Sequence, residues 1–460
     1  MKLFVRDKGF YKTFLSMTAV LALQNLITFA VNLADNVMIG GYSQTAMSGV
    51  AIVNQIQFLL QMLMLGTGGA IGVLSSQYWG KKELLPVRKV TSIGMVFGIG
   101  FAAILSVLVY LFPQEALGLL TNETAVIEEG AKYLQIICFS YVLFAVSQNL
   151  LSALRSVESV KIGFVVNLVA LVVNIGLNYC LINGVDYGNI HIPEMGVVGA
   201  AIATLCARIV EFIVVVIYVL FFDKKICWRP KHLFAMDKIM LRDYLRVGMP
   251  LILANGIWGI AMSVQTAILG RLGDDTIAAN SIATTLFQVV SVVCYASGNA
   301  SAVIIGKTVG EGDVPRVKAY AKTLQIIYLA IGVLTGLTLL LFRNLILGFY
   351  DVTPAADQLA RQFIKVLSIS VIGTSYQCAC LTGIVTGGGD TKFVLINDLI
   401  HQWLIVIPSA FLSAFVFGWP IWVTFLCLKS DQILKCFVAV IKVNRYKWIH
   451  QLTREQEIAR

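Results

Sequence analysis

A group of polar residues interrupts the first long apolar segment, around the sequence VNLADNVMIGG (31–41). Asn25, Thr28, Asn32 and Asp35 follow one another at spacings of three, four and three residues. Such spacing places side chains on one face of a helix. A polar face on a membrane-spanning helix contacts protein or water rather than lipid. A carboxylate among amide and hydroxyl oxygens can hold a proton or a sodium ion, so the pattern predicts an ion site at Asp35.

Two later apolar segments carry polar residues that we expect near Asp35. Asn174 and Asn178 lie four residues apart in the segment 162–183, and Thr204 lies in the segment 196–222. At a rise of about 1.5 Å per residue, all of them fall in the outer half of the membrane, where Asp35 also lies. We therefore predict a cation-coupling site of Asp35, Asn174, Asn178 and Thr204, with Asp35 as the ligand of any bound sodium. The alternative, ordinary hydrogen bonds between helices, stays open for Thr204 and for Asn167.

The composition indicates a polytopic, all-α membrane protein. The 460-residue chain is 58% hydrophobic and 13% charged, with a mean hydropathy of +0.81. Soluble proteins carry about a quarter charged residues. The nine cysteines have no metal-ligand spacing, which indicates buried free thiols. No catalytic serine–histidine pair, nucleophile motif or metal cluster is evident, so we do not expect an enzyme.

Twelve apolar segments are long enough to cross a bilayer. With the N-terminus inside, 29 of the 35 lysines and arginines fall on the cytoplasmic side and five outside, which is the expected bias for cytoplasmic loops. Arg208 is the one basic residue that we place within a span. The predicted spans are 13–38, 48–76, 91–112, 132–154, 162–183, 196–222, 246–271, 280–306, 322–345, 362–386, 393–416 and 419–441.

With the residues from Lys429 onward counted as cytoplasmic, three acidic residues remain inside these spans, namely Asp35, Glu211 and Asp398. Glu211 lies three residues after Arg208, and we expect a structural ion pair between them. Asp398 has the same spacing to His401, where we favour a local hydrogen bond over a proton relay. Asp35 has no such neighbour on its own helix, and a lone charge at this depth favours a functional role.

The two halves of the chain repeat at an offset of 230 residues. LALQNL (21–26) matches LILANG (251–256), Gly80 matches Gly310, and Asp35 matches Gln265. Six spans per half give a parallel repeat. We predict an N-terminal six-helix lobe (1–222), a cytoplasmic linker with a helix on the membrane surface (223–245), a C-terminal six-helix lobe (246–443) and a cytoplasmic tail (444–460). The carboxylate of Asp35 therefore occurs in the first half only, because the matched position of the second half has a glutamine.

The interface of two such halves is the usual place for a substrate site in transporters. Polar, aromatic and methionine side chains suit varied lipophilic cations. We predict that the substrate cavity is lined by Gln57, Gln61, Trp258, Met262, Gln288, Tyr376 and Gln377, although for each of them taken alone we favour plain packing.

Several motifs of the chain, in order, resemble the multidrug and toxic compound extrusion (MATE) family. They are DNVMIGG (35–41), SSQYWGKKE (75–83), NIGLNYCLINGV (174–185), EMGVVGAAIATLCARIVE (194–211), AILGRLGDDTIAANSIA (267–283) and LTGIVTGGGDTKF (381–393). The resemblance covers nearly the whole chain. It implies a V-shaped pair of six-helix lobes, and the family's N-lobe cation site maps onto Asp35, Asn174, Asn178 and Thr204.

The resemblance implies a proton- or sodium-coupled antiporter that exports organic, often cationic, drugs. It implies a monomer in the bacterial inner membrane, with both termini cytoplasmic, no cofactor beyond the coupling ion, and drug-like small molecules and the lipid bilayer, but no nucleic acid, as partners. The chain has Val20 where members often have proline, Asn178 where some have a second carboxylate, and no acidic residue on the seventh span. We therefore do not expect a second coupling site like that of some members. The alternative function is a flippase of lipid-linked precursors.

Overall fold

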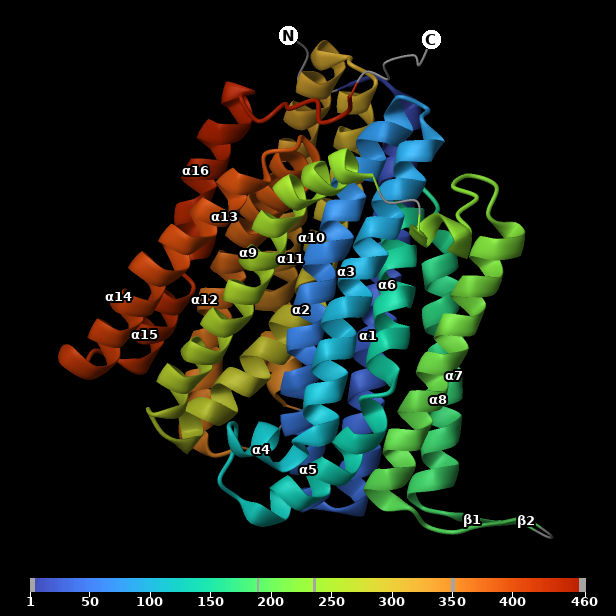
Figure 1. Ribbon diagram of the computed structural model, residues 1–460. Coiled ribbons are helices and arrows are strands. Elements are labelled where there is room, and N and C mark those ends of the chain that lie inside the picture. The colour runs from blue at the N-terminus through green and yellow to red at the C-terminus, as the bar shows by residue number, and fades with distance from the viewer. Residues whose placement is uncertain (1–4, 188–189, 235–236, 349–351, 455–460) are drawn as a thin grey trace. The chain divides into compact units, whose positions relative to one another are not determined.

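The structure, a computed structural model, describes residues 5–187, 190–234, 237–348 and 352–454 and is almost entirely helical (Figure 1). The first half contains α1 (Lys8–Tyr42), α2 (Gln44–Gly80), α3 (Leu84–Leu111), α4 (Pro113–Gly118), α5 (Thr124–Ile137), α6 (Ser140–Ser156), α7 (Lys161–Ile182), β1 (Val185–Tyr187), β2 (Ile190–Ile192), α8 (Gly196–Ile217), η1 (Tyr218–Phe222) and η2 (Pro230–Phe234). The second contains α9 (Lys238–Gly270), α10 (Asp274–Gly310), α11 (Val314–Leu347), α12 (Pro354–Cys378), η3 (Ala379–Val385), α13 (Thr391–Leu399), η4 (Ile400–Val406), α14 (Ile407–Phe411), η5 (Leu412–Val416), α15 (Ile421–Leu428) and α16 (Asp431–Arg445).

The helices confirm the predicted all-α polytopic fold of twelve spans. Within the described ranges, ten helical segments are each long and apolar enough to cross a membrane. The bent pair α5 and α6, which meet at 56°, forms a further span. The last predicted span, 419–441, is divided between α15 and α16, with Lys429 and Ser430 at the break. Large apolar side chains such as Ile104 and Phe221 are exposed on these helices, as lipid-facing residues are.

The chain divides into two compact units. Unit 1 comprises the described residues of Met1–Ala22, Ser76–Glu83 and Met249–Arg460, and unit 2 comprises Leu23–Ser75 and those of Leu84–Gly248. The start of α1 and the end of α2 thus belong to the same unit as the second repeat, while the first turns of α9 belong with the first repeat. Residues 238–245 form those turns of α9, so the separate surface helix expected in this part of the linker is wrong.

Unit 2 places α7 and α8 side by side, joined by the short antiparallel hairpin of β1 and β2 (Figure 1). The backbones approach closely because α8 has a glycine at the contact. A Cβ atom on Gly199 would collide with the backbone carbonyl of Leu181 on α7. Small residues permit such close helix packing in membranes. This contact fixes Asn174 and Asn178 of α7 relative to Thr204 of α8.

Unit 1 packs around its own apolar core, in which the rings of Phe363 and Phe425 stack with centroids 4.0 Å apart. Three of its helical segments, η3, η4 and η5, are π-helical. A π-helical turn adds a residue per turn and rotates the side chains that follow it. Residues of α13, η4 and α14 that face the same neighbour are therefore not spaced regularly by three and four residues.

Candidate functional site

Asp35 lies on α1 in contact with α7. Its Oδ1 atom accepts a hydrogen bond from Nδ2 of Asn178, and the same amide group donates to Oδ1 of Asn174 at 3.2 Å. Both asparagines are fully buried, whereas the carboxylate is half-buried. The four-residue spacing of the asparagines, one turn of α7, allows one amide to contact both partners. The structure thus brings together the residues from these two predicted spans.

Thr204 completes the predicted group from α8. Nδ2 of Asn174 contacts its Oγ1 at 3.4 Å, and the hydroxyl also shares a hydrogen bond with Tyr133 of α5. Tyr133 is 2% exposed. This tyrosine was not predicted from the sequence, because it falls at the start of an apolar segment with nothing in its spacing to set it apart. The group therefore draws on α1, α5, α7 and α8 and is polar without a second carboxylate.

Two features of this group suit the binding of a cation. Among the described residues, no lysine, arginine or histidine forms a salt bridge with Asp35, and Arg208 acts on it only electrostatically. Oδ1 of Asn178 is buried without a hydrogen-bond partner. A buried acceptor that lacks a donor costs about 1–3 kcal/mol. A proton or a sodium ion at this point would neutralise the carboxylate, and sodium could also use the unpaired oxygen.

The predicted Arg208–Glu211 pair is confirmed, with Nη1 and Oε2 2.6 Å apart. Gln148 donates to the other oxygen of Glu211 at 3.4 Å, and the guanidinium lies 4.8 Å from the ring centroid of Phe144. The carboxylate of Glu211 is thus neutralised in place, unlike that of Asp35. This contrast separates a structural ion pair from a carboxylate that has no counterion in contact.

The polar face of α1 is only partly used. Nδ2 of Asn167 donates to Oγ1 of Thr28 at 3.4 Å, which ties α1 to α7 by the interhelical hydrogen bond that the sequence left open. Asn25 and Asn32 are exposed and outside the Asp35 group. Residues on one helical face share a direction, but the neighbouring helix covers only part of its length.

The seven residues predicted for the substrate cavity are divided between the two units, so a shared cavity stays a prediction. Gln57 and Gln61 belong to unit 2 and the other five to unit 1. Tyr376 donates to Oε1 of Gln325 at 2.7 Å, and Gln377 to Oε1 of Gln432 at 2.8 Å. Trp258 lines a small pocket in unit 1. A larger hollow there, of about 330 Å³, contains none of the seven and is lined by Gln362, Lys365, Val366, Ile369, Ser370, Trp422, Leu426 and Ile433.

Asp398 corrects another expectation. Its carboxylate lies 2.7 Å from Nζ of Lys435 on α16, whereas Nδ1 of His401 contacts the backbone carbonyl of Asn397 at 2.8 Å. The predicted hydrogen bond between Asp398 and His401 is therefore wrong. A π-helical segment begins at Ile400, so the regular one-turn pairing is lost. Lys435, which we counted as cytoplasmic, is 4% exposed within unit 1, so Arg208 is not the only basic residue in the spans.

Known proteins match the chain over nearly its full length. The MatE family model matches residues 21–180 and 250–412, two segments that begin 229 residues apart and therefore bear out the repeat. The probable multidrug resistance protein NorM of Listeria monocytogenes is 25% identical over 95% of this chain and 94% of its own. That of Thermotoga maritima is 23% identical over 94% and 92%.

Solved structures share the fold. The D35N mutant of the Vibrio cholerae MATE transporter VcmN superposes with a TM-score of 0.86 at 18% identity, covering 96% of this chain and 98% of its own. A MATE protein in the straight conformation gives a TM-score of 0.84 at 16% identity, covering 94% and 95%. The two family matches, the duplicated six-span halves and the shared fold lead to one assignment. The chain belongs to the MATE family of multidrug efflux transporters, a family of membrane proteins rather than enzymes.

Proposed function

We propose that the protein is a cation-coupled antiporter that exports organic cations by alternating access, with Asp35 as the coupling site. The observation that carries the proposal is the state of this carboxylate. It is enclosed by Asn178 and Asn174, has no salt-bridge partner among the described residues, and lies beside an unpaired amide oxygen. Unpaired intramembrane charges are costly and mark ion pathways.

The coupling follows from charge. An empty site carries one negative charge that the amide of Asn178 only partly stabilises. A proton or a sodium ion entering from outside cancels the charge and relaxes the hold of the amide on α1. The export cycle requires this neutral state to favour release of the drug outside and the charged state to favour its uptake inside. A difference of about 1.4 kcal/mol between the two states changes their ratio tenfold.

We further propose that the protein is a monomer in the bacterial inner membrane, with both termini cytoplasmic and small lipophilic cations as substrates. With Lys435 moved from the cytoplasmic side into a span, 28 basic residues inside and five outside support this orientation. The flippase alternative requires a cationic cavity for phosphate groups. Lys435 adds a second buried cation, but Asp398 and Asp431 lie 2.7 and 3.5 Å from it, so the local charge is negative. That charge supports cation export over phosphate binding.

The test is ethidium efflux from proteoliposomes under an imposed proton gradient, and separately under a sodium gradient. Asp35→Asn keeps the size of the side chain and removes the charge. We expect it to lower gradient-driven efflux at least tenfold, because the coupling ion no longer changes the charge of the site. The gradient that drives the wild-type protein identifies the ion.

Asp274→Asn is the matched control. Asp274 is an exposed carboxylate at the start of α10, so its loss leaves efflux unchanged. Equal amounts of folded protein in the liposomes, measured by size-exclusion chromatography before reconstitution, exclude a folding effect. Undiminished gradient-driven efflux in Asp35→Asn would remove Asp35 from the coupling mechanism.

A further inference from the structure

Unit 1 contains a second buried charge cluster, formed by Asp398, Asp431 and Lys435. Nζ of Lys435 lies 2.7 Å from Oδ1 of Asp398 and 3.5 Å from Oδ2 of Asp431. The side chains of Lys435 and Asp431 are 5% and 2% exposed, and that of Asp398 is 26% exposed. Two carboxylates share one ammonium group, so the three ionised side chains together carry one net negative charge.

The two carboxylates are held differently. Asp431 accepts hydrogen bonds at Oδ2 from Nε2 of Gln432 at 2.7 Å and from Nε2 of Gln402 at 3.3 Å. Gln402 is held in turn by Gln265 at 3.1 Å. Among the described residues, Lys435 is the only donor to Asp398. Hydrogen bonds to a carboxylate favour its charged form. The network therefore holds Asp431 by three donors and leaves Asp398 dependent on the lysine alone.

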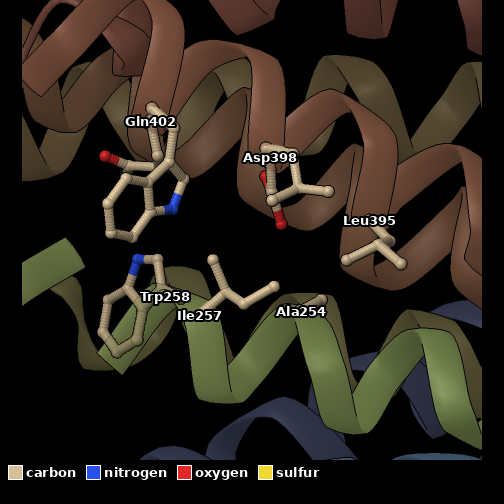
Figure 2. A pocket seen from close by; sticks show the side chains of 8 residues that line it. Ala254, Ile257, Trp258, Leu395, Asp398 and Gln402 are labelled. Atoms are coloured by element: carbon tan, nitrogen blue, oxygen red, sulfur yellow. The ribbon is translucent and has the colours of Figure 1, made fainter. Parts of the chain in front are cut away.

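Asp398 also faces a small cavity. Figure 2 shows Trp258, Ile257 and Ala254 of α9 opposite Asp398 and Gln402. The cavity has a volume of about 10 Å³, and a single water needs about 10–15 Å³. Trp403 lines it as well, and its indole Nε1 is buried without an acceptor. The space admits a water or a proton and excludes a drug, and Asp398 is the carboxylate that it reaches.

We propose that Asp398, Lys435 and Asp431 form a second proton-exchange site, located in unit 1. A proton from water in the cavity binds a carboxylate oxygen of Asp398. The Lys435 ammonium keeps its own protons and moves its hydrogen bond from Asp398 to Asp431, where the glutamines already hold the negative charge. The cluster passes from one net negative charge to none, and the reverse step returns the proton to water.

Other titratable groups face the cluster from the elements packed around it. They are Cys378 of α12, Tyr295 of α10, Lys429 at the C-terminal end of α15 and Cys436 of α16, together with His401 of η4, three residues after Asp398. Asp398 remains the one carboxylate of the cluster with access to water.

Infrared difference spectroscopy tests the site directly, because a protonated carboxyl group has its own carbonyl stretching band. The purified protein with Asp35→Asn, which removes the other candidate carboxylate, is stepped between mildly acidic and mildly alkaline buffer. We expect a carboxyl band that appears in acid and disappears in alkali. Adding Asp398→Asn removes this band, and Asp398→Glu shifts its frequency and keeps its pH response.

Glu211→Gln is the control, because Glu211 is a buried carboxylate of unit 2 that is paired with its own arginine, and we expect no change in the band. Persistence of an unshifted band in both Asp398 variants, or its absence before Asp398 is changed, overturns the proposal. Since Asp398→Glu retains a carboxylate, a folding defect in Asp398→Asn does not decide the result.

The role of this site in export rests on the proposed antiport. A pH-sensitive dye inside the proteoliposomes counts the protons moved per exported ethidium, and we expect Asp398→Asn to lower that number by one. The spectroscopic result does not require transport. Failure of coupled efflux with a positive band would refute the antiport and leave the proton site, whereas coupled efflux without the band would refute only the site.

Discussion

The Asp35 group of unit 2 and the Asp398 cluster of unit 1 occupy the two halves of a duplicated chain. In the first, one carboxylate on α1 is bound by the amides of α7 and has no basic partner among the described residues. In the second, the equivalent of Asp35 is the neutral Gln265, which holds Gln402 at 3.1 Å. The carboxylates there come from α13 and α16, and a lysine lies between them.

The two halves of the repeat both have a polar side chain at the matched position, Asp35 and Gln265. The charged groups of the two sites, however, come from different helices. α1 and α9 both present a polar side chain to a neighbouring helix at the matched position. Only α1 uses it to carry the charge, while α9 uses it to hold a glutamine against Asp431. A lone carboxylate changes charge by binding an ion. A carboxylate that shares a lysine changes charge by binding a proton while the lysine moves its hydrogen bond to the other carboxylate.

Removal of the lysine should have the largest effect on stability. Lys435→Met leaves two buried carboxylates without a cation, and breaking a buried ion pair costs about 3–5 kcal/mol. Arg208→Met in unit 2 leaves one carboxylate, which still accepts a hydrogen bond from Gln148. We expect the apparent melting temperature, followed by a thiol-reactive dye, to fall more for Lys435→Met than for Arg208→Met.

Lys132→Met serves as the control for the loss of a lysine. Lys132 pairs with Glu129 at 2.6 Å, but its side chain is 55% exposed, so its removal should not shift the melting temperature measurably. If Lys435→Met melts together with this control, the cluster does not carry the buried charge that we assign to it.

A smaller effect should separate the matched positions themselves. Gln265→Leu removes the donor that holds Oε1 of Gln402, and a buried acceptor left without its partner costs about 1–3 kcal/mol. We expect a lower melting temperature with efflux within about twofold of wild type, a difference below about 0.5 kcal/mol in the barrier.

Asn178→Leu is the counterpart in unit 2 and should lower coupled efflux itself, because the amide that contacts Asp35 is lost. Proteoliposome efflux normalised to folded protein distinguishes the two variants. Equal losses of efflux from both would mean that the two halves use this position in the same way.

Much of the Asp35 group could be predicted because its members lie on regular helices. The four-residue spacing of Asn174 and Asn178 survives in α7, and the depth of Thr204 follows from a constant rise per residue. Tyr133 could not be recognised in this way. Its contact with Thr204 depends on how α5 packs against α8, which no periodicity within either helix encodes.

The Asp398 cluster was missed for two physical reasons. Asp398 and Lys435 lie 37 residues apart, and a π-helical segment after Leu399 changes the face that the chain presents. We also counted Lys429 and every later charged residue as cytoplasmic, although Lys429 and Lys435 lie within the predicted span 419–441. One signal was available, since Asp431 and Lys435 are spaced one helical turn apart within the predicted span 419–441.

A third carboxylate, which is in contact with water, extends the comparison. Its replacement should change the stability of the protein least. Asp7 precedes α1 in unit 1 and accepts a hydrogen bond from the Tyr320 hydroxyl at 2.8 Å. This bond, with backbone N–H groups of Gly9 and Phe10 and the charge of Arg316, lowers the pKa of Asp7 below its ordinary value of 3.8. A lowered pKa stabilises the fold above 3.8, and that stabilisation is lost as the pH falls through the pKa of the folded protein.

At neutral pH we therefore expect Asp7→Asn to lower stability by at most about 0.5 kcal/mol, because water screens the contact. The difference from wild type in melting temperature should vanish as the pH is lowered to about 3. Tyr320→Phe removes the hydrogen bond that lowers the pKa of Asp7 most. In a protein with this change, adding Asp7→Asn should therefore lower the melting temperature less than it does in wild type. If the difference in melting temperature between Asp7→Asn and wild type stays constant with pH, Asp7 stabilises the protein through packing. The surroundings of this carboxylate would then not affect its charge, in contrast to what we propose for Asp35 and Asp398.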